Sequence, residues 1–259
     1  EREPDFERDQ YRVGLGHSQI FIDRGRIVDM QLASIRVYPL KAAAGIEVEQ
    51  WEVDSFGLRH DRRFMLVDPE GVFVTQREEP RLALLRPRVE RDTLHLTAPG
   101  AGERALALEP RQGDLLRVRV WSAELRALAP DPGVDRWLSE FCGRPLRLVY
   151  LPETSFRRVD ARYAPERRRT SFTDGFPFLV IGQASLDALN QRLAQPLPMD
   201  RFRPNLVVGG CEPFAEDAWA RIRIGELAFD LVKPCSRCVV TTTDQALGVR
   251  DGDEPLRTL

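Results

Sequence analysis

The chain of 259 residues is 42% hydrophobic and 30% charged, with 38 basic against 40 acidic side chains. This length suits one or two domains with a core large enough to fold without disulfides or a structural metal, and the near balance of charge gives no overall field for nucleic acid or an anionic membrane. A transmembrane helix needs about 20 apolar residues, whereas the longest apolar runs here, such as residues 176–182, have about seven.

Residues 1–30 do not have the features of a secretory signal, because they lack a continuous apolar stretch and a small-residue cleavage site. The first convincing predicted strand, residues 35–38, follows soon after Met30. We therefore interpret residues 1–30 as an extension outside the folded domains, and Met30 as a candidate natural start.

Residues 31–151 form the first predicted domain, and their pattern is mostly β. Short runs alternate apolar and polar side chains between turn residues, which is typical of strands. The clearest pair is Phe64–Val67 with Val72–Thr75, because the Asp-Pro-Glu-Gly sequence between them favours a hairpin turn. Further strands are predicted at residues 35–38, 47–53, 93–97, 105–108, 116–121 and 146–151.

One helix is predicted inside this first domain. Asp131 is a suitable N-cap, Pro132 fits the first helical turn, and Gly143 ends the segment. Apolar side chains between them follow the helical spacing i, i+3, i+4, i+7. They are Val134, Trp137, Leu138 and Phe141.

Residues 152–173 form an Arg-rich connector, in which six arginines stand against three acidic residues. We expect a solvated surface loop here, and the functional alternative is a lid over an anionic ligand. Residues 174–259 form the second predicted domain, which is also built on strands. Its predicted elements are strands at 178–181 and 206–208, a helix with Leu186, Leu189 and Leu193 on one face, and a hairpin of 221–224 with 227–232.

The segment Cys235-Ser236-Arg237-Cys238 carries the most distinctive chemistry of the sequence. The cationic Lys233 and Arg237 favour a thiolate, which makes either sulfur a nucleophile or a metal ligand. A zinc site lacks a second ligand pair, and a thioredoxin-type pair expects a helix where the β-branched residues 239–243 predict a strand. A single soft thiolate ligand to a transition metal and a pair of packed thiols are the other interpretations.

Six segments, taken in chain order, resemble one family. They are Tyr38-Pro39-Leu40-Lys41, residues 57–64 (GLRHDRRF), residues 75–82 (TQREEPRL), residues 174–179 (DGFPFL), Phe202-Arg203-Pro204-Asn205, and the CSRC segment with residues 241–244 (TTTD). The chain from Met30 to Leu259 resembles MOSC proteins that carry an N-terminal MOSC β-barrel domain, of the amidoxime-reducing type. The resemblance implies a mainly β fold with a few helices (α+β), in which an N-terminal β-barrel-like domain precedes a MOSC β-barrel domain.

The resemblance also implies a molybdenum cofactor, in which a pterin dithiolene holds the metal and a protein cysteine completes its ligands. The matching residue is Cys238, and a soft thiolate suits such a metal. By the same match, Cys238 and Asp174 are the candidate catalytic residues. The residues implied to hold the pterin and its phosphate are Lys41, Arg63, Asp174, Arg203, Asn205, Ser236 and Arg237.

Three departures from the family pattern stand out. Ala42 replaces a serine, Gly175-Phe176 replaces a residue that usually carries a hydroxyl, and the sequence stops at Leu259, where the family normally continues through further strands. We therefore expect an apparently truncated second barrel. Pyridoxal phosphate is not expected, since only Lys41 and Lys233 could form a Schiff base.

The implied function is a two-electron reduction of an N–O bond in small N-hydroxylated substrates. Electrons would come from a separate ferredoxin-like or haem protein, because one CxxC pair cannot supply an iron–sulfur cluster. The alternative is a non-redox carrier of the cofactor or of a persulfide. No nucleic acid and no membrane span are expected. Four cysteines without a disulfide framework, and an Arg-rich composition typical of GC-rich genomes, favour a cytoplasmic, bacterial protein.

Overall fold

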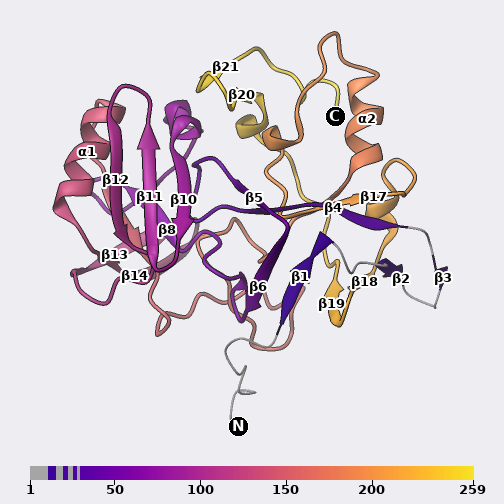
Figure 1. The fold of residues 1–259 in the computed structure, drawn as a ribbon, viewed down its shortest axis with the longest axis horizontal. Coiled ribbons are helices and arrows are strands. Elements are labelled where there is room, and N and C mark those ends of the chain that lie inside the picture. The colour runs from indigo at the N-terminus through magenta and orange to yellow at the C-terminus, as the bar shows by residue number, and fades with distance from the viewer. Residues whose placement is uncertain (1–10, 16–19, 23–25, 28–29) are drawn as a thin grey trace.

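The computed structural model describes residues 11–15, 20–22, 26–27 and 30–259. Within these residues the chain forms two lobes that are mostly strands, with two α-helices (Figure 1). One lobe carries β8 to β15 and α1, and the other carries β4, β16 to β19 and α2. The predicted mainly β fold with a few helices is confirmed.

The first lobe is built on a five-stranded sheet in the order β13-β14-β15-β8-β9. A three-stranded sheet, β10-β11-β12, packs near it. The strands are β8 (Phe64–Val67), β9 (Phe73–Val74), β10 (Arg86–Glu90), β11 (Thr93–Ala98), β12 (Gly102–Ala107), β13 (Asp114–Val120), β14 (Ala123–Ala129) and β15 (Arg147–Tyr150). The predicted hairpin is confirmed, since β8 and β9 pair antiparallel.

Strand β8 shows why this lobe has a core on each face of its sheet. Phe64 and Leu66 join the core that includes α1, whereas Met65 and Val67 join a second core on the opposite face. Successive side chains of a strand point to opposite faces, so a strand buried on both sides is apolar throughout. Helix α1 (Pro132–Cys142) covers the first core and is capped as predicted, because Asp131 Oδ1 accepts hydrogen bonds from two backbone N–H groups.

The second lobe combines strands from distant parts of the chain. Its main sheet has the order β16-β17-β4-β5, where β4 (Gln31–Val37) pairs antiparallel with β17 (Leu206–Gly209). The other elements are β1 (Arg12–Gly14), β2 (Ile20–Ile22), β3 (Arg26–Ile27), β5 (Ile46–Val48), β6 (Gln50–Asp54), β7 (Gly57–Leu58), β16 (Val180–Gly182), α2 (Gln183–Asn190), β18 (Arg221–Ile224), β19 (Leu227–Asp230), β20 (Thr243–Asp244) and β21 (Val249–Arg250). The chain therefore leaves this lobe after β7, builds the first lobe, and returns.

One prediction about local structure is wrong, and a second holds only in part. Of the β-branched residues 239–243, only Thr243 lies in a strand (β20), and Val239–Thr242 form a short 3₁₀ helix instead. There the hydroxyls of Thr241 and Thr242 donate to backbone carbonyls three residues earlier, which satisfies the turn locally. The connector is also not solvated throughout, because Arg157 is 7% exposed.

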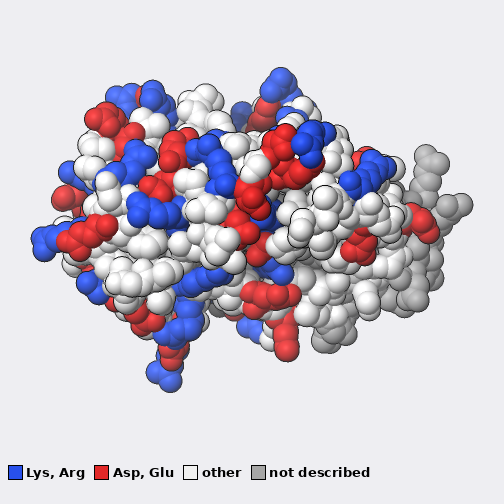
Figure 2. Space-filling model, turned by 90° about the horizontal axis from the view of Figure 1, so that it is seen from above, with Lys and Arg blue, Asp and Glu red and all other residues white. Residues whose placement is uncertain are grey.

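Part of the segment interpreted as an extension is included in the described structure. Strands β1 and β2 lie within residues 11–22, and their Val13 and Ile20 side chains are buried in the core of the second lobe. On the face seen from above, acidic and basic side chains are interleaved (Figure 2). That face shows no uniform basic surface of the kind that follows a nucleic-acid backbone.

Candidate functional site

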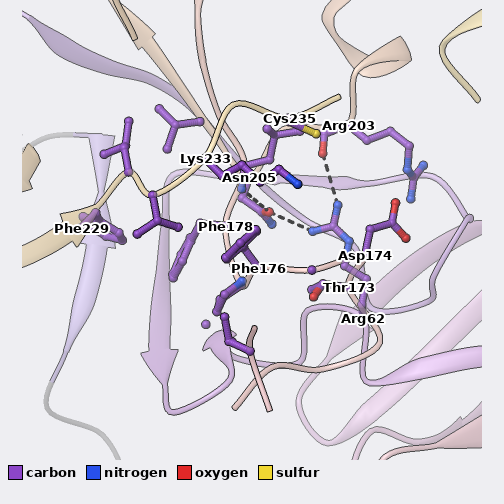
Figure 3. Close-up of a pocket in the computed structure, with 18 of the residues that line it drawn as sticks. Arg62, Thr173, Asp174, Phe176, Phe178, Arg203, Asn205, Phe229, Lys233 and Cys235 are labelled. Atoms are coloured by element: carbon purple, nitrogen blue, oxygen red, sulfur yellow. Dashed lines mark hydrogen bonds between the residues drawn. The ribbon is translucent and has the colours of Figure 1, made fainter. Parts of the chain in front are cut away.

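A cleft with a volume of about 2090 Å³ lies where the two lobes meet. The loop after β4, the segment at residues 173–178 and the loop at residues 231–238 all contribute to its lining. Charged side chains gather at one end, and aromatic side chains at the other (Figure 3). The order of the strands thus brings residues about 200 positions apart, such as Lys41 and Cys238, into one site.

Lys41 and Asp174 form an ion pair at the charged end. The Lys41 Nζ donates to Asp174 Oδ1 at 2.6 Å and to the carbonyl oxygen of Phe172 at 2.8 Å. Burial lowers the pKa of Lys41 to about 8, although Asp174 opposes this shift. Burial alone would raise the pKa of Asp174, but Lys41 and Arg77 hold it well below its usual range. Asp174 is therefore a carboxylate at neutral pH.

Arg157 fixes the backbone that presents Asp174. Its guanidinium donates to the carbonyl oxygens of Ser171, Thr173 and Asp174, at 2.8, 2.6 and 3.1 Å. A planar guanidinium can hold several carbonyl groups in one geometry. Arg157 is therefore a positioning residue within the connector. The sequence analysis predicted only a solvated loop for this segment.

Asn205 lies at the centre of a buried polar network. Its Oδ1 accepts from Arg62 Nη1 at 2.9 Å, and its Nδ2 donates to Asp61 Oδ1 at 3.1 Å. Arg62 Nη1 also donates to Asp61 Oδ2 at 2.6 Å. The network places the Arg62 guanidinium beside the backbone of Arg203, as the dashed lines in Figure 3 show. Two of the predicted site regions are thus joined through hydrogen bonds.

Arg203 presents an unsatisfied donor at the cleft. Its Nη2 is buried and has no hydrogen-bond partner among the described residues. Its guanidinium lies 4.4 Å from the centre of the Tyr38 ring, and burial lowers its pKa to about 10. The backbone of Arg203 is left-handed, with φ of 56°, a strained conformation that concentrates at functional sites. An anionic group bound here would satisfy the orphaned nitrogen.

Cys238 is held by a residue from the other lobe. Arg77 Nη2 donates to Cys238 Sγ at 3.2 Å, and the same guanidinium lies 4.8 Å from the centre of the Trp121 ring. A cationic donor on sulfur suits an anionic, metal-ligating thiolate. Cys235 is exposed, and its sulfur makes only a long contact of 3.7 Å to the carbonyl oxygen of Ser236. The structure therefore distinguishes Cys238, whose sulfur accepts from an arginine, from the exposed Cys235. The spacing of the two cysteines in the sequence could not make this distinction.

The other two cysteines lie in different surroundings. Burial raises the pKa of Cys142 to about 12, and burial also raises the pKa of Cys211. Both are therefore protonated at neutral pH. Within the described part of the chain, no group of three or more His, Cys, Asp and Glu side chains is arranged to hold a metal.

The remaining predicted site residues lie in varied positions. Ser236 and Arg237 are on the cysteine loop, where Ser236 is exposed and the Arg237 guanidinium lies 5.4 Å from the centre of the Phe202 ring. Arg63 borders the cleft, but its Nε and Nη2 both donate to the carbonyl oxygen of Leu151. Its charge is thus directed into the first lobe.

Sequence reasoning missed Arg62, Arg77, Trp121 and Arg157 as site residues. Arg62 and Arg77 lie in two of the segments that resemble the family, residues 57–64 and 75–82. Each segment holds more than one arginine, and the sequence does not indicate which of them faces the cleft. Trp121 belongs to the site because its Nε1 donates to Asp174 Oδ1 at 3.2 Å. The two residues are 53 positions apart, so no sequence pattern indicated this contact.

Aromatic side chains form the opposite end of the cleft. Phe178 and Phe229 pack edge to face with ring centres 5.0 Å apart, and Phe176 packs against Tyr163 in the same way at 5.7 Å. Phe176, which departs from the family pattern, therefore belongs to this apolar end (Figure 3).

Fold and site together define a two-lobed, mainly β protein whose cleft places an unsatisfied guanidinium nitrogen and one arginine-bound thiol in the same site. Residues 29–145 match the MOSC N-terminal beta barrel domain, and residues 167–259 match the MOSC domain. The chain belongs to the MOSC family, which confirms the resemblance seen in the motifs.

Similar relatives include proteins named mitochondrial amidoxime-reducing component 1, from Mus musculus and Homo sapiens. They are 36% and 34% identical over 238 residues, which is 88% of this chain and 70% of each relative. Mitochondrial amidoxime reducing component 2 of Rattus norvegicus is 33% identical over 239 residues, covering 88% of this chain and 71% of the relative. These relatives are named as mitochondrial, so a cytoplasmic, bacterial setting stays a prediction.

A solution structure of a Bordetella bronchiseptica protein covers 38% of this chain and 84% of its own, with 18% identity and a TM-score of 0.32. That score is too low to support an argument about the fold. Among the described residues, no helix is both long and apolar enough to cross a membrane.

Proposed function

We propose that this chain binds a molybdenum cofactor in the cleft, with Cys238 as the protein ligand to the metal, and reduces small N-hydroxylated compounds. The hydrogen bond from Arg77 to the Cys238 sulfur is the observation that carries the proposal. The orphaned Arg203 Nη2 supports the fit, because the cofactor is anionic. The names of the relatives support the choice of N-hydroxylated substrates.

The residues of the chain divide the binding task between the two lobes. Arg203 has the unsatisfied Nη2 that can bind a phosphate oxygen, and Arg62, which Asn205 holds in place, adds a second positive charge at the cleft. Ser236 and Arg237 adjoin the metal-binding thiol on its own loop. In this arrangement Arg62 takes the place that the motif match gave to Arg63.

When bound, the cofactor supplies the two-electron redox chemistry, and the protein supplies orientation and electrostatics. The aromatic end of the cleft offers an apolar surface for the substrate body, and its packed rings exclude water from that side. Electrons are delivered by a separate ferredoxin-like or haem protein.

Elemental analysis by mass spectrometry tests the metal assignment. Wild type, Cys238→Ala and Cys235→Ala are purified from cells that make the cofactor. We expect about one Mo per chain in wild type and in Cys235→Ala, and strong loss in Cys238→Ala alone. Zinc instead of molybdenum, or equal metal content in all three proteins, would overturn the assignment.

A carrier of the cofactor or of a persulfide is the second candidate function, and the exposure of Cys235 favours it. A surface thiol can exchange with a partner more readily than a buried one. Turnover separates the two functions. A reductase converts many equivalents of an N-hydroxy compound with an artificial one-electron donor, whereas a carrier transfers a single equivalent.

A further inference from the structure

Reduction of an N–OH group to N–H and water consumes protons as well as electrons, and the cleft holds one group suited to supply them. We infer that Lys41 donates a proton to the oxygen atom that leaves the substrate nitrogen, and that Asp174 orients the lysine ammonium group. This inference rests on the proposed reductase function. It adds a catalytic role for a residue that the family resemblance implied only as part of the cofactor-binding set.

The position of Lys41 suits a proton donor. Its ammonium group has three N–H bonds, and two of them are directed to Asp174 and to the carbonyl oxygen of Phe172. The third is left for a ligand in the cleft, which Lys41 borders. The Lys41 side chain is 8% exposed, whereas that of Asp174 is 62% exposed, so the pair connects a sheltered ammonium to solvent.

The charges that face Lys41 come from three other parts of the chain. Burial is the largest influence and lowers its pKa to about 8, Asp174 raises the pKa, and Arg157 and Arg62 lower it further. The Phe73 ring lies 5.7 Å from the Nζ and carries no charge. A general acid works best when its pKa is near the working pH. Lys41 is therefore protonated at pH 7 and can lose its proton readily.

The neighbouring groups cannot take this role. The pKa of Arg62 is raised, and that of Arg203, although burial lowers it to about 10, still lies above the value of about 8 for Lys41. Asp174 is a carboxylate at neutral pH, because Lys41 and Arg77 hold its pKa well below the usual range. Lys233 is exposed on the cysteine loop, with its Nζ 5.5 Å from the centre of the Tyr163 ring. It is therefore not sheltered from solvent as Lys41 is.

The step balances in atoms and charge. The N–O bond breaks, two electrons come from the donor protein, and the oxygen leaves as water. Lys41 gives the proton that completes this water, and solvent gives the proton that the nitrogen takes up. Solvent then protonates the neutral lysine amine again, with the exposed Asp174 carboxylate stabilising the restored ammonium.

The first test uses protein without cofactor and takes advantage of the two lysines in the chain. Lysine labelled with ¹³C at Cε gives two NMR signals, and Lys233→Arg assigns them. We expect a Lys41 pKa of about 8, shifted from the usual 10.5. In Asp174→Asn the Lys41 pKa falls further, because the favourable charge is lost. A Lys41 titration indistinguishable from that of Lys233 would overturn the inference.

The second test measures turnover per bound Mo. Lys41→Arg keeps the positive charge but cannot release a proton, so kcat should fall at least about 100-fold. KM and Mo content should change less than about twofold, and the loss of wild-type activity above pH 8 should disappear. Arg86→Lys, a charge-conserving change at a residue that does not line the cleft, is the matched control and should keep both kcat and the pH profile.

The outcomes separate the two proposals. Wild-type protein with bound Mo and no turnover refutes the proposed reductase function, and this inference with it. Wild-type turnover that Lys41→Arg retains, with the same pH profile, refutes the inference and leaves the reductase function standing.

Discussion

Asp61 is a buried carboxylate whose removal should destabilise the protein strongly. It is 2% exposed and accepts hydrogen bonds from the backbone N–H of Tyr38 at 2.8 Å, from Asn205 Nδ2 at 3.1 Å and from Arg62 Nη1 at 2.6 Å. Asp61→Asn keeps the shape but removes the charge, which leaves the buried Arg62 guanidinium without its counter-ion. Breaking a buried ion pair in this way costs about 3–5 kcal/mol.

Differential scanning calorimetry at pH 7.5 measures this effect. In a protein of this size, 1 kcal/mol corresponds to about 2–4 °C in Tm, so Asp61→Asn should lower Tm by about 6–20 °C. The matched control is Asp160→Asn, which makes the same change in an exposed pair with Arg162. Solvent screens a pair at the surface, so the control should lower Tm much less than Asp61→Asn does. Equal shifts for the two variants would refute the argument that burial makes this pair important.

Three further predictions follow from single contacts. Asp131→Ala removes the cap of α1 and should cost about 1 kcal/mol, seen as a Tm lower by about 2–4 °C; an unchanged Tm would show that the cap is dispensable. Burial lowers the pKa of His60 to about 4, so the unfolded chain binds the proton first and stability is lost as pH falls from 6.5 to 4, by up to about 3 kcal/mol. His60→Asn, which tolerates the left-handed backbone there, should abolish this loss in urea titrations, and an unaltered pH dependence would contradict the assignment. Arg77→Gln should speed Mo release about 10- to 150-fold, since a hydrogen bond to a charged group contributes about 1.5–3 kcal/mol; equal release from Arg77→Gln and the control Arg86→Gln would exclude a role for the contact with Cys238.

Elements that depend on local chemistry could be predicted from the sequence. The β8–β9 hairpin follows from its Pro and Gly turn residues, and α1 follows from Asp131, Pro132 and Gly143. In each case the signal and the structure lie within about a dozen residues. Pairing between distant strands leaves no such signal, and the β4–β17 pairing joins segments about 170 positions apart.

The directions in which adjacent arginine side chains point could not be predicted from the sequence either. Arg62 and Arg63 are neighbours of the same type, but one bonds to Asn205 and the other to the carbonyl oxygen of Leu151. The backbone at Arg62 is left-handed, with φ of 48°, a local conformation that the sequence pattern did not predict. The sequence motif contains both arginines, and only tertiary structure shows that their guanidinium groups point in different directions.

The charged end of the cleft is incomplete in either lobe alone. Trp121 and Arg77 come from the segment that builds the first lobe, whereas Asp174, Arg203 and Cys238 come from the returning chain. Arg77 joins the two across 161 positions of sequence through the Cys238 sulfur. A ligand that binds only the assembled cleft stabilises the folded state by mass action. A cofactor bound as proposed should therefore stabilise the contact between the lobes as well as each lobe.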